Sequence, residues 1–109
     1  MMIIRPGDFW VADIPFTDGS ASKKRPVLVL WLEGKDIVVC AITTASPRSR
    51  TDVSLNEWQM SGLRQPTVAR LSRLDCLEQA LLLARLGVIS GSDAKTVHDV
   101  WDRFVKPQF

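Results

Sequence analysis

The chain has 109 residues, of which 46% are hydrophobic and 24% are charged. These proportions are those of an ordinary folded protein, so extended disorder is not expected. The length suits one domain, which we place over residues 1–109. The apolar runs are too short to cross a bilayer, and charged residues near the N-terminus interrupt any signal sequence. We therefore expect a cytoplasmic protein.

The charge is concentrated in the middle of the chain. The net charge is only +2, but residues 20–75 hold nine Lys or Arg against five Asp or Glu. Residues 1–19 hold one basic and three acidic side chains. A basic middle is compatible with a polyanionic partner such as a nucleic acid, although surface charges often serve only solvation.

The residues that bind metals are sparse. Cys40 and Cys76 lack metal-ligand spacing, and His98, the one imidazole of the chain, has no cysteine or acidic cluster arranged around it. No nucleophile elbow or phosphate-binding glycine loop occurs. We therefore expect two reduced, partly buried thiols, a solvated or rim histidine, and no metal or cofactor.

The hydrophobic pattern predicts several short strands. Aromatic and β-branched residues, alternating polarity and turn residues indicate strands over 7–14, 27–32, 37–44, 52–55 and 66–74. Residues 33–36 form a hairpin turn, and residues 17–24, 45–50 and 56–63 are loops. Residues 77–86 are ambiguous, since their composition favours helix and their context favours strand. We interpret them as a brief helical turn followed by a final strand.

The last element is a helix. Ser90–Asp93 supplies N-cap residues, and Pro107 stops the helix. Val97, Val100, Trp101 and Phe104 fall at i, i+3, i+4 and i+7, which makes one apolar face for docking on the core. Antiparallel hairpins predominate in the chain, so the expected fold is mainly β, a small antiparallel barrel with a C-terminal helix.

The hairpin between the second and third predicted strands brings two polar residues together. Arg25 precedes one strand and Thr43 ends the other, so antiparallel pairing should place them side by side. An arginine beside threonine hydroxyls is a reasonable phosphate clamp, because the guanidinium can donate two parallel hydrogen bonds. The alternative is structural: Arg25 pairs with Asp8 or Asp13, and Thr43 merely ends a strand.

Several segments together resemble the MazF/PemK family of toxins from type II toxin–antitoxin systems. The resemblance spans roughly residues 7–104, and it depends on the order and spacing of the segments because no single one is specific. The matching segments are Gly7-Asp8-Phe9-Trp10-Val11, Gly19-Ser20, Lys24-Arg25-Pro26-Val27-Leu28-Val29-Leu30, Val38-Val39-Cys40-Ala41-Ile42-Thr43-Thr44, Pro66-Thr67-Val68-Ala69-Arg70 and Leu86-Gly87-Val88-Ile89-Ser90.

This resemblance implies a fold and an activity. The fold would be an SH3-like, CcdB/MazF-type barrel, assembled as a homodimer. The activity would be metal-independent, sequence-specific cleavage of single-stranded RNA. In this reaction the 2′-hydroxyl of the RNA attacks the adjacent phosphate and leaves a 2′,3′-cyclic phosphate and a 5′-hydroxyl. The protein need only supply a base, an acid and stabilisation of the charged transition state.

The resemblance also assigns roles to residues. Arg25 would be the central catalytic arginine, as acid or as stabiliser, Thr43 would bind the scissile phosphate, and Arg70 would be a second functional arginine. Ser20 and Ser72 depart from the family, since relatives often carry a histidine and an aspartate there, and serine is a poor base. Asp75 could substitute, but five residues from Arg70 it points to the opposite face of a regular strand.

Further RNA contacts would come from the flanking loops. Trp58 either stacks on a base or packs against its own domain, and the second role is the simpler one. Trp10 is expected in the core. The residues expected to contact RNA are Ser20, Lys23, Lys24, Thr44, Arg48, Arg50, Ser72 and Arg73.

Two other functions remain open on the sequence. One is a gyrase-binding toxin of the CcdB type, which shares the fold but needs no phosphate site. The other is a weak or inactive family member that acts as a binding module. In every version the implied partner is a cognate antitoxin whose disordered or helical tail covers the basic site. Trp101 and Phe104 could belong to a dimer interface instead of the core.

Overall fold

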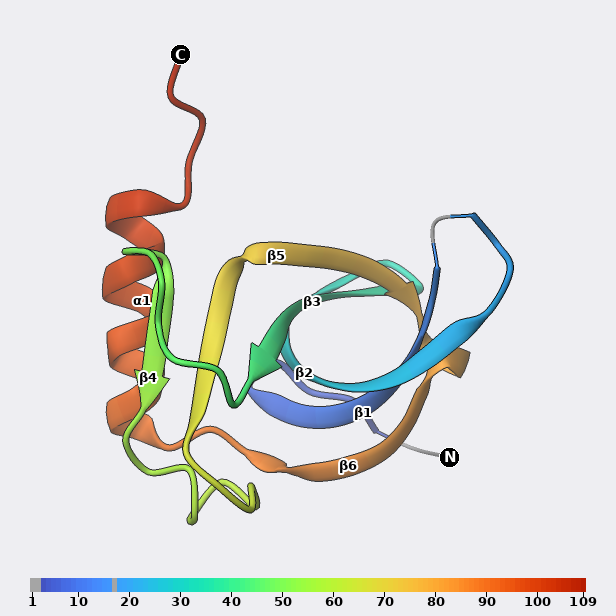
Figure 1. The fold of residues 1–109 in the computed structure, drawn as a ribbon, viewed down its shortest axis with the longest axis horizontal. Coiled ribbons are helices and arrows are strands. Elements are labelled where there is room, and N and C mark those ends of the chain that lie inside the picture. The colour runs from blue at the N-terminus through green and yellow to red at the C-terminus, as the bar shows by residue number, and fades with distance from the viewer. Residues whose placement is uncertain (1–2, 17) are drawn as a thin grey trace.

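Six strands form one antiparallel sheet in the computed structural model, which describes residues 3–16 and 18–109. The order across the sheet is β4-β5-β3-β2-β1-β6, and the sheet curls strongly into a barrel-like shape (Figure 1). This confirms the predicted mainly β fold with a C-terminal helix. The elements are β1 (Asp8–Pro15), β2 (Ser22–Glu33), β3 (Asp36–Thr43), β4 (Asp52–Leu55), β5 (Thr67–Glu78), the 3-10 turn η1 (Gln79–Leu81), β6 (Leu82–Val88) and α1 (Gly91–Phe104).

Both faces of the central strands are buried, which explains their continuous apolar runs. Alternate residues of a strand point to opposite faces, so neighbours such as Val27 and Leu28 enter different cores. One core lies inside the curl and is called the interior core; its buried residues are Trp10, Ala12, Val27, Val29, Ile37, Val39, Leu77 and Leu82. The other is called the helix-side core; its buried residues are Phe9, Leu28, Cys40, Ile42, Val53, Leu55, Ala69, Leu71 and Val97.

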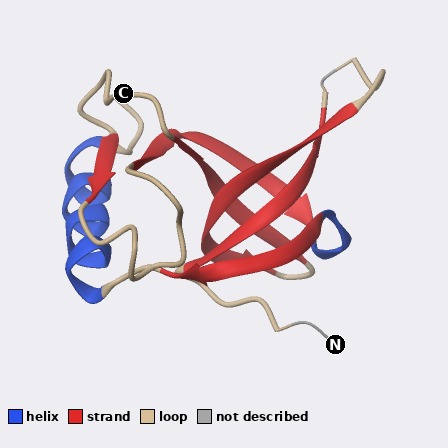
Figure 2. Ribbon diagram, turned by 60° about the horizontal axis from the view of Figure 1, so that its bottom comes forward, coloured by secondary structure: helices blue, strands red, loops and turns tan. Residues whose placement is uncertain are grey.

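Helix α1 lies against one side of the curled sheet (Figure 2). The predicted capping is confirmed, because the Ser90 side chain accepts a hydrogen bond from the backbone N–H of Asp93. Val97 is buried in the helix-side core, and Val100 and Trp101 pack against it as partly buried residues. Among residues 3–16 and 18–109, no helix is long and apolar enough to span a membrane.

Two strands extend beyond their predicted ends. The expected loop 17–24 becomes strand at Ser22, because β1 and β2 stay paired from Pro15↔Ser22 onward; Thr17 lies outside the described residues. β5 continues past Leu74 to Glu78, because β3 supplies partners for this stretch. The predicted turn and strand after it are confirmed as η1 and β6.

Strand β5 contains a large bulge. Cys40 of β3 pairs with Leu74, but the next residue, Ala41, pairs with Arg70, so residues 71–73 have no partner on β3. Leu71 instead donates its backbone N–H to the carbonyl of Thr51 and is fully buried in the helix-side core. A bulge bends a strand and re-aims the side chains that follow. The two halves of β5 therefore follow different alternation patterns.

The cysteines are both free thiols in the described part of the chain. Cys40 belongs to the helix-side core, and burial raises the pKa of its thiol to about 12. Cys76 is exposed on β5, so only one of the two thiols matches the expectation of burial.

Candidate functional site

An open, basic hollow lies over the mouth of the interior core. Its volume is about 710 Å³, and Val27 and Val39 of the interior core form part of its floor. Three strands and the loops beside them supply its polar wall, which consists of Asp18, Arg25, Thr43, Arg48, Arg70, Arg73 and Asp75. Four guanidinium groups against two carboxylates give this wall a positive charge, which suits a phosphate-bearing ligand. We call it the basic hollow.

Arg25 and Thr43 both line the basic hollow, which agrees with the expectation from the hairpin that they lie close together. The β2–β3 ladder ends at the pair Val27↔Ala41, two positions before each of them. The alternative partner Asp8 is already used, because its carboxylate binds Arg85 at 3.3 Å and accepts a hydrogen bond from Trp10 Nε1. Among residues 3–16 and 18–109, neither of the two ion pairs involves Arg25.

The Thr43 hydroxyl already makes one hydrogen bond, as an acceptor. Its oxygen accepts a hydrogen bond of 3.1 Å from the backbone N–H of Ala45. This interaction fixes the oxygen and leaves the hydroxyl proton available to donate, because a hydroxyl both donates and accepts. Thr43 can therefore donate to a phosphate oxygen bound in the basic hollow.

Arg70 is the most deeply placed cation of the site. The residue is 8% exposed, and its Nη1 lies 3.6 Å from Asp52 Oδ2 without forming a hydrogen bond. In the part of the chain that the structure describes, Arg70 Nη1 is the one buried side-chain nitrogen or oxygen without a hydrogen-bond partner. Nη1 is held near Asp52 by charge, and Arg70 adds to the positive wall of the basic hollow.

The predicted RNA-contacting residues separate into two groups. Arg48 and Arg73 line the basic hollow, and Thr44 lines two smaller hollows beside it. Lys23 and Lys24 are exposed on β2 but do not line it. Arg50 lies over the Phe104 ring of α1, 4.7 Å from the ring centre. Phe104 is not part of the helix-side core, unlike the other three residues of its helical stripe.

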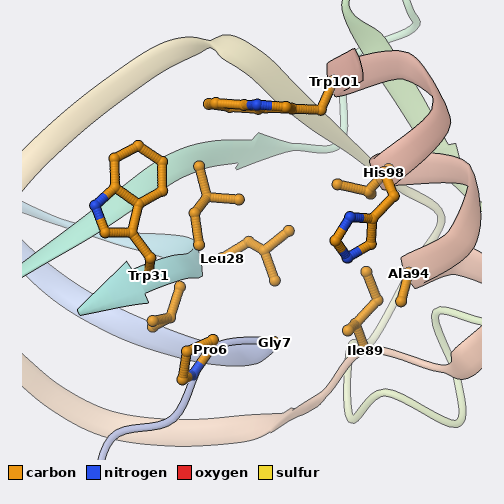
Figure 3. A pocket seen from close by; sticks show the side chains of 11 residues that line it. Pro6, Gly7, Leu28, Trp31, Ile89, Ala94, His98 and Trp101 are labelled. Atoms are coloured by element: carbon orange, nitrogen blue, oxygen red, sulfur yellow. The ribbon is translucent and has the colours of Figure 1, made fainter.

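A second hollow of about 360 Å³ lies between α1 and β2 and is apolar. Trp31 and Trp101 stand edge to face across it with ring centres 5.8 Å apart, and His98 lies at its edge (Figure 3). His98 is exposed, as expected for a rim residue. This hollow offers no cationic cluster, so phosphate chemistry belongs to the basic hollow.

Comparison with known proteins decides the family. The family model described as "PemK-like, MazF-like toxin of type II toxin-antitoxin system" matches residues 5–104. The chain belongs to this family of toxins. No curated protein matches it significantly.

Solved structures agree with the PemK-like fold. "Endoribonuclease from Mycobacterial species" superposes with a TM-score of 0.76 at 14% identity, over 100% of this chain and 97% of that one. "Mycobacterium tuberculosis toxin MazF-mt6" gives 0.66 at 24% identity, over 87% and 96%. A mycobacterial endoribonuclease in complex with its cognate antitoxin gives 0.77 at 14% identity, over 98% and 100%.

Ser72 and Asp75, both considered from the sequence of this PemK-like chain, lie in different surroundings on β5. Ser72 lies in the β5 bulge, exposed and outside the lining of the basic hollow. Asp75 does line it, together with Arg70, because the bulge breaks the alternation that would have set them on opposite faces. From the sequence, Asp75 was expected on the face opposite to Arg70, because a regular strand was assumed. The irregular pairing of β5 shows that this expectation was wrong.

Asp18 is the other carboxylate of the basic hollow. Its Oδ1 accepts hydrogen bonds from both the backbone N–H and the hydroxyl of Ser20, at 2.9 and 2.7 Å. These two hydrogen bonds lower the pKa of Asp18, which makes it a weaker base. Ser20 therefore holds Asp18 and does not itself line the hollow. Asp75 accepts one hydrogen bond, 3.0 Å long, from the backbone N–H of Cys76 to its Oδ1. Its Oδ2 makes no hydrogen bond within the described residues, so that oxygen can accept a proton from a substrate.

Proposed function

We propose that this toxin is a metal-independent, sequence-specific endoribonuclease that cleaves single-stranded RNA in the basic hollow. Arg25, Thr43, Arg70 and Asp75 are its catalytic residues, and Arg48 and Arg73 bind neighbouring phosphates. The observation that carries the proposal is the convergence of these residues on one hollow, whose wall holds four arginines against two aspartates. Family membership makes RNA the phosphate-bearing substrate to test first.

The reaction is an internal transfer within the RNA. The 2′-oxygen attacks phosphorus, the bond from phosphorus to the 5′-oxygen breaks, and the products are a 2′,3′-cyclic phosphate and a 5′-hydroxyl. The nucleophile belongs to the substrate, so the protein activates no water and needs no metal for that purpose. Asp75 accepts the 2′-hydroxyl proton as general base, and water protonates the leaving 5′-oxygen.

The cationic side chains stabilise the pentacoordinate phosphorus that forms in the transition state. Charge accumulates on the non-bridging oxygens as the 2′-oxygen adds, and positioned donors stabilise this charge in the transition state. Arg25 donates from the β2 side and Thr43 from the end of β3. Arg70 donates from the wall, where its low exposure strengthens the interaction. Arginine remains protonated at all ordinary pH values, so we assign it stabilisation and not proton transfer.

The partners follow from the family. We propose a cytoplasmic homodimer that is neutralised by a cognate antitoxin, whose acidic tail covers the basic hollow and excludes RNA. A mycobacterial neighbour was solved with its own antitoxin, which makes such a complex a reasonable expectation for this chain. Charge complementarity with the four arginines of the hollow would speed association and weaken in high salt.

The decisive experiment maps cleavage products. The purified protein is incubated in EDTA with a long RNA that contains structured and unstructured regions, beside Arg25→Ala and beside a substrate with a 2′-deoxy sugar at each mapped cut. We expect discrete cuts with cyclic-phosphate and 5′-hydroxyl ends, and loss of cutting in both controls. Removal of one such donor typically lowers the rate by about 10²–10³. No cutting by folded wild-type protein would overturn the proposal and direct attention to gyrase inhibition, which Arg25→Ala should leave intact.

A further inference from the structure

The basic hollow continues into two smaller ones. A middle hollow of about 460 Å³ shares Pro26, Ile42 and Thr43 with it. A third, of about 330 Å³, shares Thr44 and Thr67 with the middle one. Because neighbouring hollows share wall residues, the three lie next to one another around the end of β3, and we call the series the groove.

The chemistry of this groove changes along its length. The basic hollow holds four arginines, and the middle hollow holds one, Arg64, beside Gln65. The third hollow has no charged side chain in its lining; its polar wall includes Asn56, two serines and two threonines, and it contains Trp58. We call it the neutral hollow. Phosphates prefer the arginine-rich end, whereas uncharged bases suit amides and an indole.

The amides of the groove are available for binding. Asn56 and Gln65 are both exposed, and within residues 3–16 and 18–109 neither side-chain amide makes a hydrogen bond. Only their main-chain groups are engaged: Asn56 N–H donates to Asp93, and the carbonyl of Gln65 accepts from Thr67 Oγ1. An amide carries both donors and an acceptor, so it can recognise the edge of a base.

The segment that carries Asn56 and Trp58, residues 56–63, is held rigidly. The carboxylate of Asp93 accepts the backbone N–H groups of Asn56 and Glu57 at 3.0 and 2.9 Å. Trp58 packs on the helix-side core while still lining the neutral hollow. This confirms that Trp58 packs within its own domain, and it leaves part of the residue accessible. A preformed surface loses less conformational entropy on binding.

We propose that this groove is the recognition track for the RNA nucleotides next to the cut. The inference depends on the proposed function and makes it more specific. The scissile phosphate lies in the basic hollow, the adjoining base lies in the middle hollow against Gln65, and the next base lies in the neutral hollow against Asn56 and Trp58. Gln65 and Asn56 are specificity-determining residues, and they take no part in the bond-breaking step.

The test separates recognition from cleavage. Asn56→Ala/Gln65→Ala is compared with wild type and with Gln59→Ala, an exposed amide of the same segment that lines none of the three hollows. Cut sites are mapped on a random-sequence RNA pool. Binding is measured in parallel by anisotropy, using a pool of short single-stranded RNAs with 2′-O-methyl sugars throughout, which cannot be cut, and selection of the bound fraction.

We expect the double variant to cut with unchanged end chemistry but weaker base preference on one side of the cut. Each lost hydrogen bond corresponds to roughly a three- to tenfold loss of discrimination. Gln59→Ala should match wild type. Unchanged base preference in an active double variant would overturn the track while leaving the nuclease intact.

The binding measurement covers the case of an inactive protein. If wild type binds the pool with a base preference that the double variant loses, the proposed recognition track is supported even when no cleavage is observed. If wild type binds no single-stranded pool, or binds it without any base preference, the track is overturned.

Discussion

Two buried charged side chains, Asp93 and Arg70, differ in the hydrogen-bond partners that the fold supplies to them. Asp93 is 1% exposed, and its two oxygens accept backbone N–H groups of Asn56 and Glu57. Arg70 is 8% exposed and faces Asp52, yet its Nη1 lacks a hydrogen bond in the described structure. The first residue ties α1 to the 56–63 segment. The second stands in the wall of the basic hollow.

The difference distinguishes structural charge from functional charge. A buried carboxylate that receives hydrogen bonds stabilises the fold through groups that are already present. A buried guanidinium held by a 3.6 Å ion pair contributes less to stability, because burial costs both charges their solvation. Asp93 should therefore matter for folding and Arg70 for substrate, and the following substitutions test that division.

The largest effect is expected at Asp75. Asp75→Asn keeps the shape of the side chain and removes its ability to accept a proton, so the rate of RNA cleavage should fall by about 10²-fold or more. Ser72→Ala is the matched control, since Ser72 lies in the same strand but outside the basic hollow. Equal rates for Asp75→Asn and wild type would remove Asp75 from the mechanism.

A similarly large effect, on folding, is expected at Asp93. Asp93→Ala leaves two backbone donors without their acceptor, so the free energy of unfolding should fall by about 2–4 kcal/mol. Urea denaturation measures this change. Asp102→Ala on the exposed face of α1 serves as control and should change little. A loss under 1 kcal/mol would show that water replaces the carboxylate and that the segment is not anchored in this way.

Arg70→Lys should give the complementary result. Lysine keeps a positive charge beside Asp52, so stability should remain within about 1 kcal/mol of wild type. It cannot donate two parallel hydrogen bonds, so cleavage should slow by about tenfold. Arg103→Lys on α1 is the control. A variant that loses stability but keeps its cleavage rate would reverse the roles assigned to Arg70 and Asp93.

The smallest effect concerns Glu57, next to the Asp93 anchor. A hydrogen bond from Ser92, supported by Ser90, lowers the pKa of Glu57 below its ordinary value of 4.5. A lowered folded-state pKa gives stability that is present above the ordinary pKa and is lost as the pH falls through the folded-state pKa. Thermal melts should therefore show Glu57→Gln slightly below wild type at neutral pH, with the difference disappearing in acid. A difference that stays constant with pH would contradict this.

Local patterns in the sequence were sufficient for most of the fold. Alternating polarity located the strands, and Ser90 marked the start of α1, because these signals depend on near neighbours. The continuous apolar run at the centre of β2 indicated burial on both faces. Arg25 and Thr43 were brought together by simple hairpin pairing. These features follow from the chain's own periodicity and its turns.

Features that depend on distant partners were missed. Residues 71–73 leave the ladder because Leu71 bonds to Thr51, and no alternation in β5 records that choice. Asp75 was therefore expected on the wrong face. The contact of the Arg50 guanidinium with Phe104, on a helix far along the chain, was likewise not predicted, and its RNA contact stays a prediction. Such contacts are decided by tertiary packing, which the local sequence does not encode.

The close contact between Gly62 and Gly87 fixes the position of the 56–63 segment against β6. A Cβ on Gly62 would lie 2.1 Å from the carbonyl oxygen of Leu86, and one on Gly87 would lie 1.9 Å from that of Ser61. The two backbones therefore touch with no side chain between them. If the 56–63 segment shifted by one residue in either direction, Ser61 or Leu63 would have to occupy this space. The segment therefore has one register against β6. New RNA preferences in this toxin would then arise by exchanging side chains along the groove, not by shifting the segment that carries them.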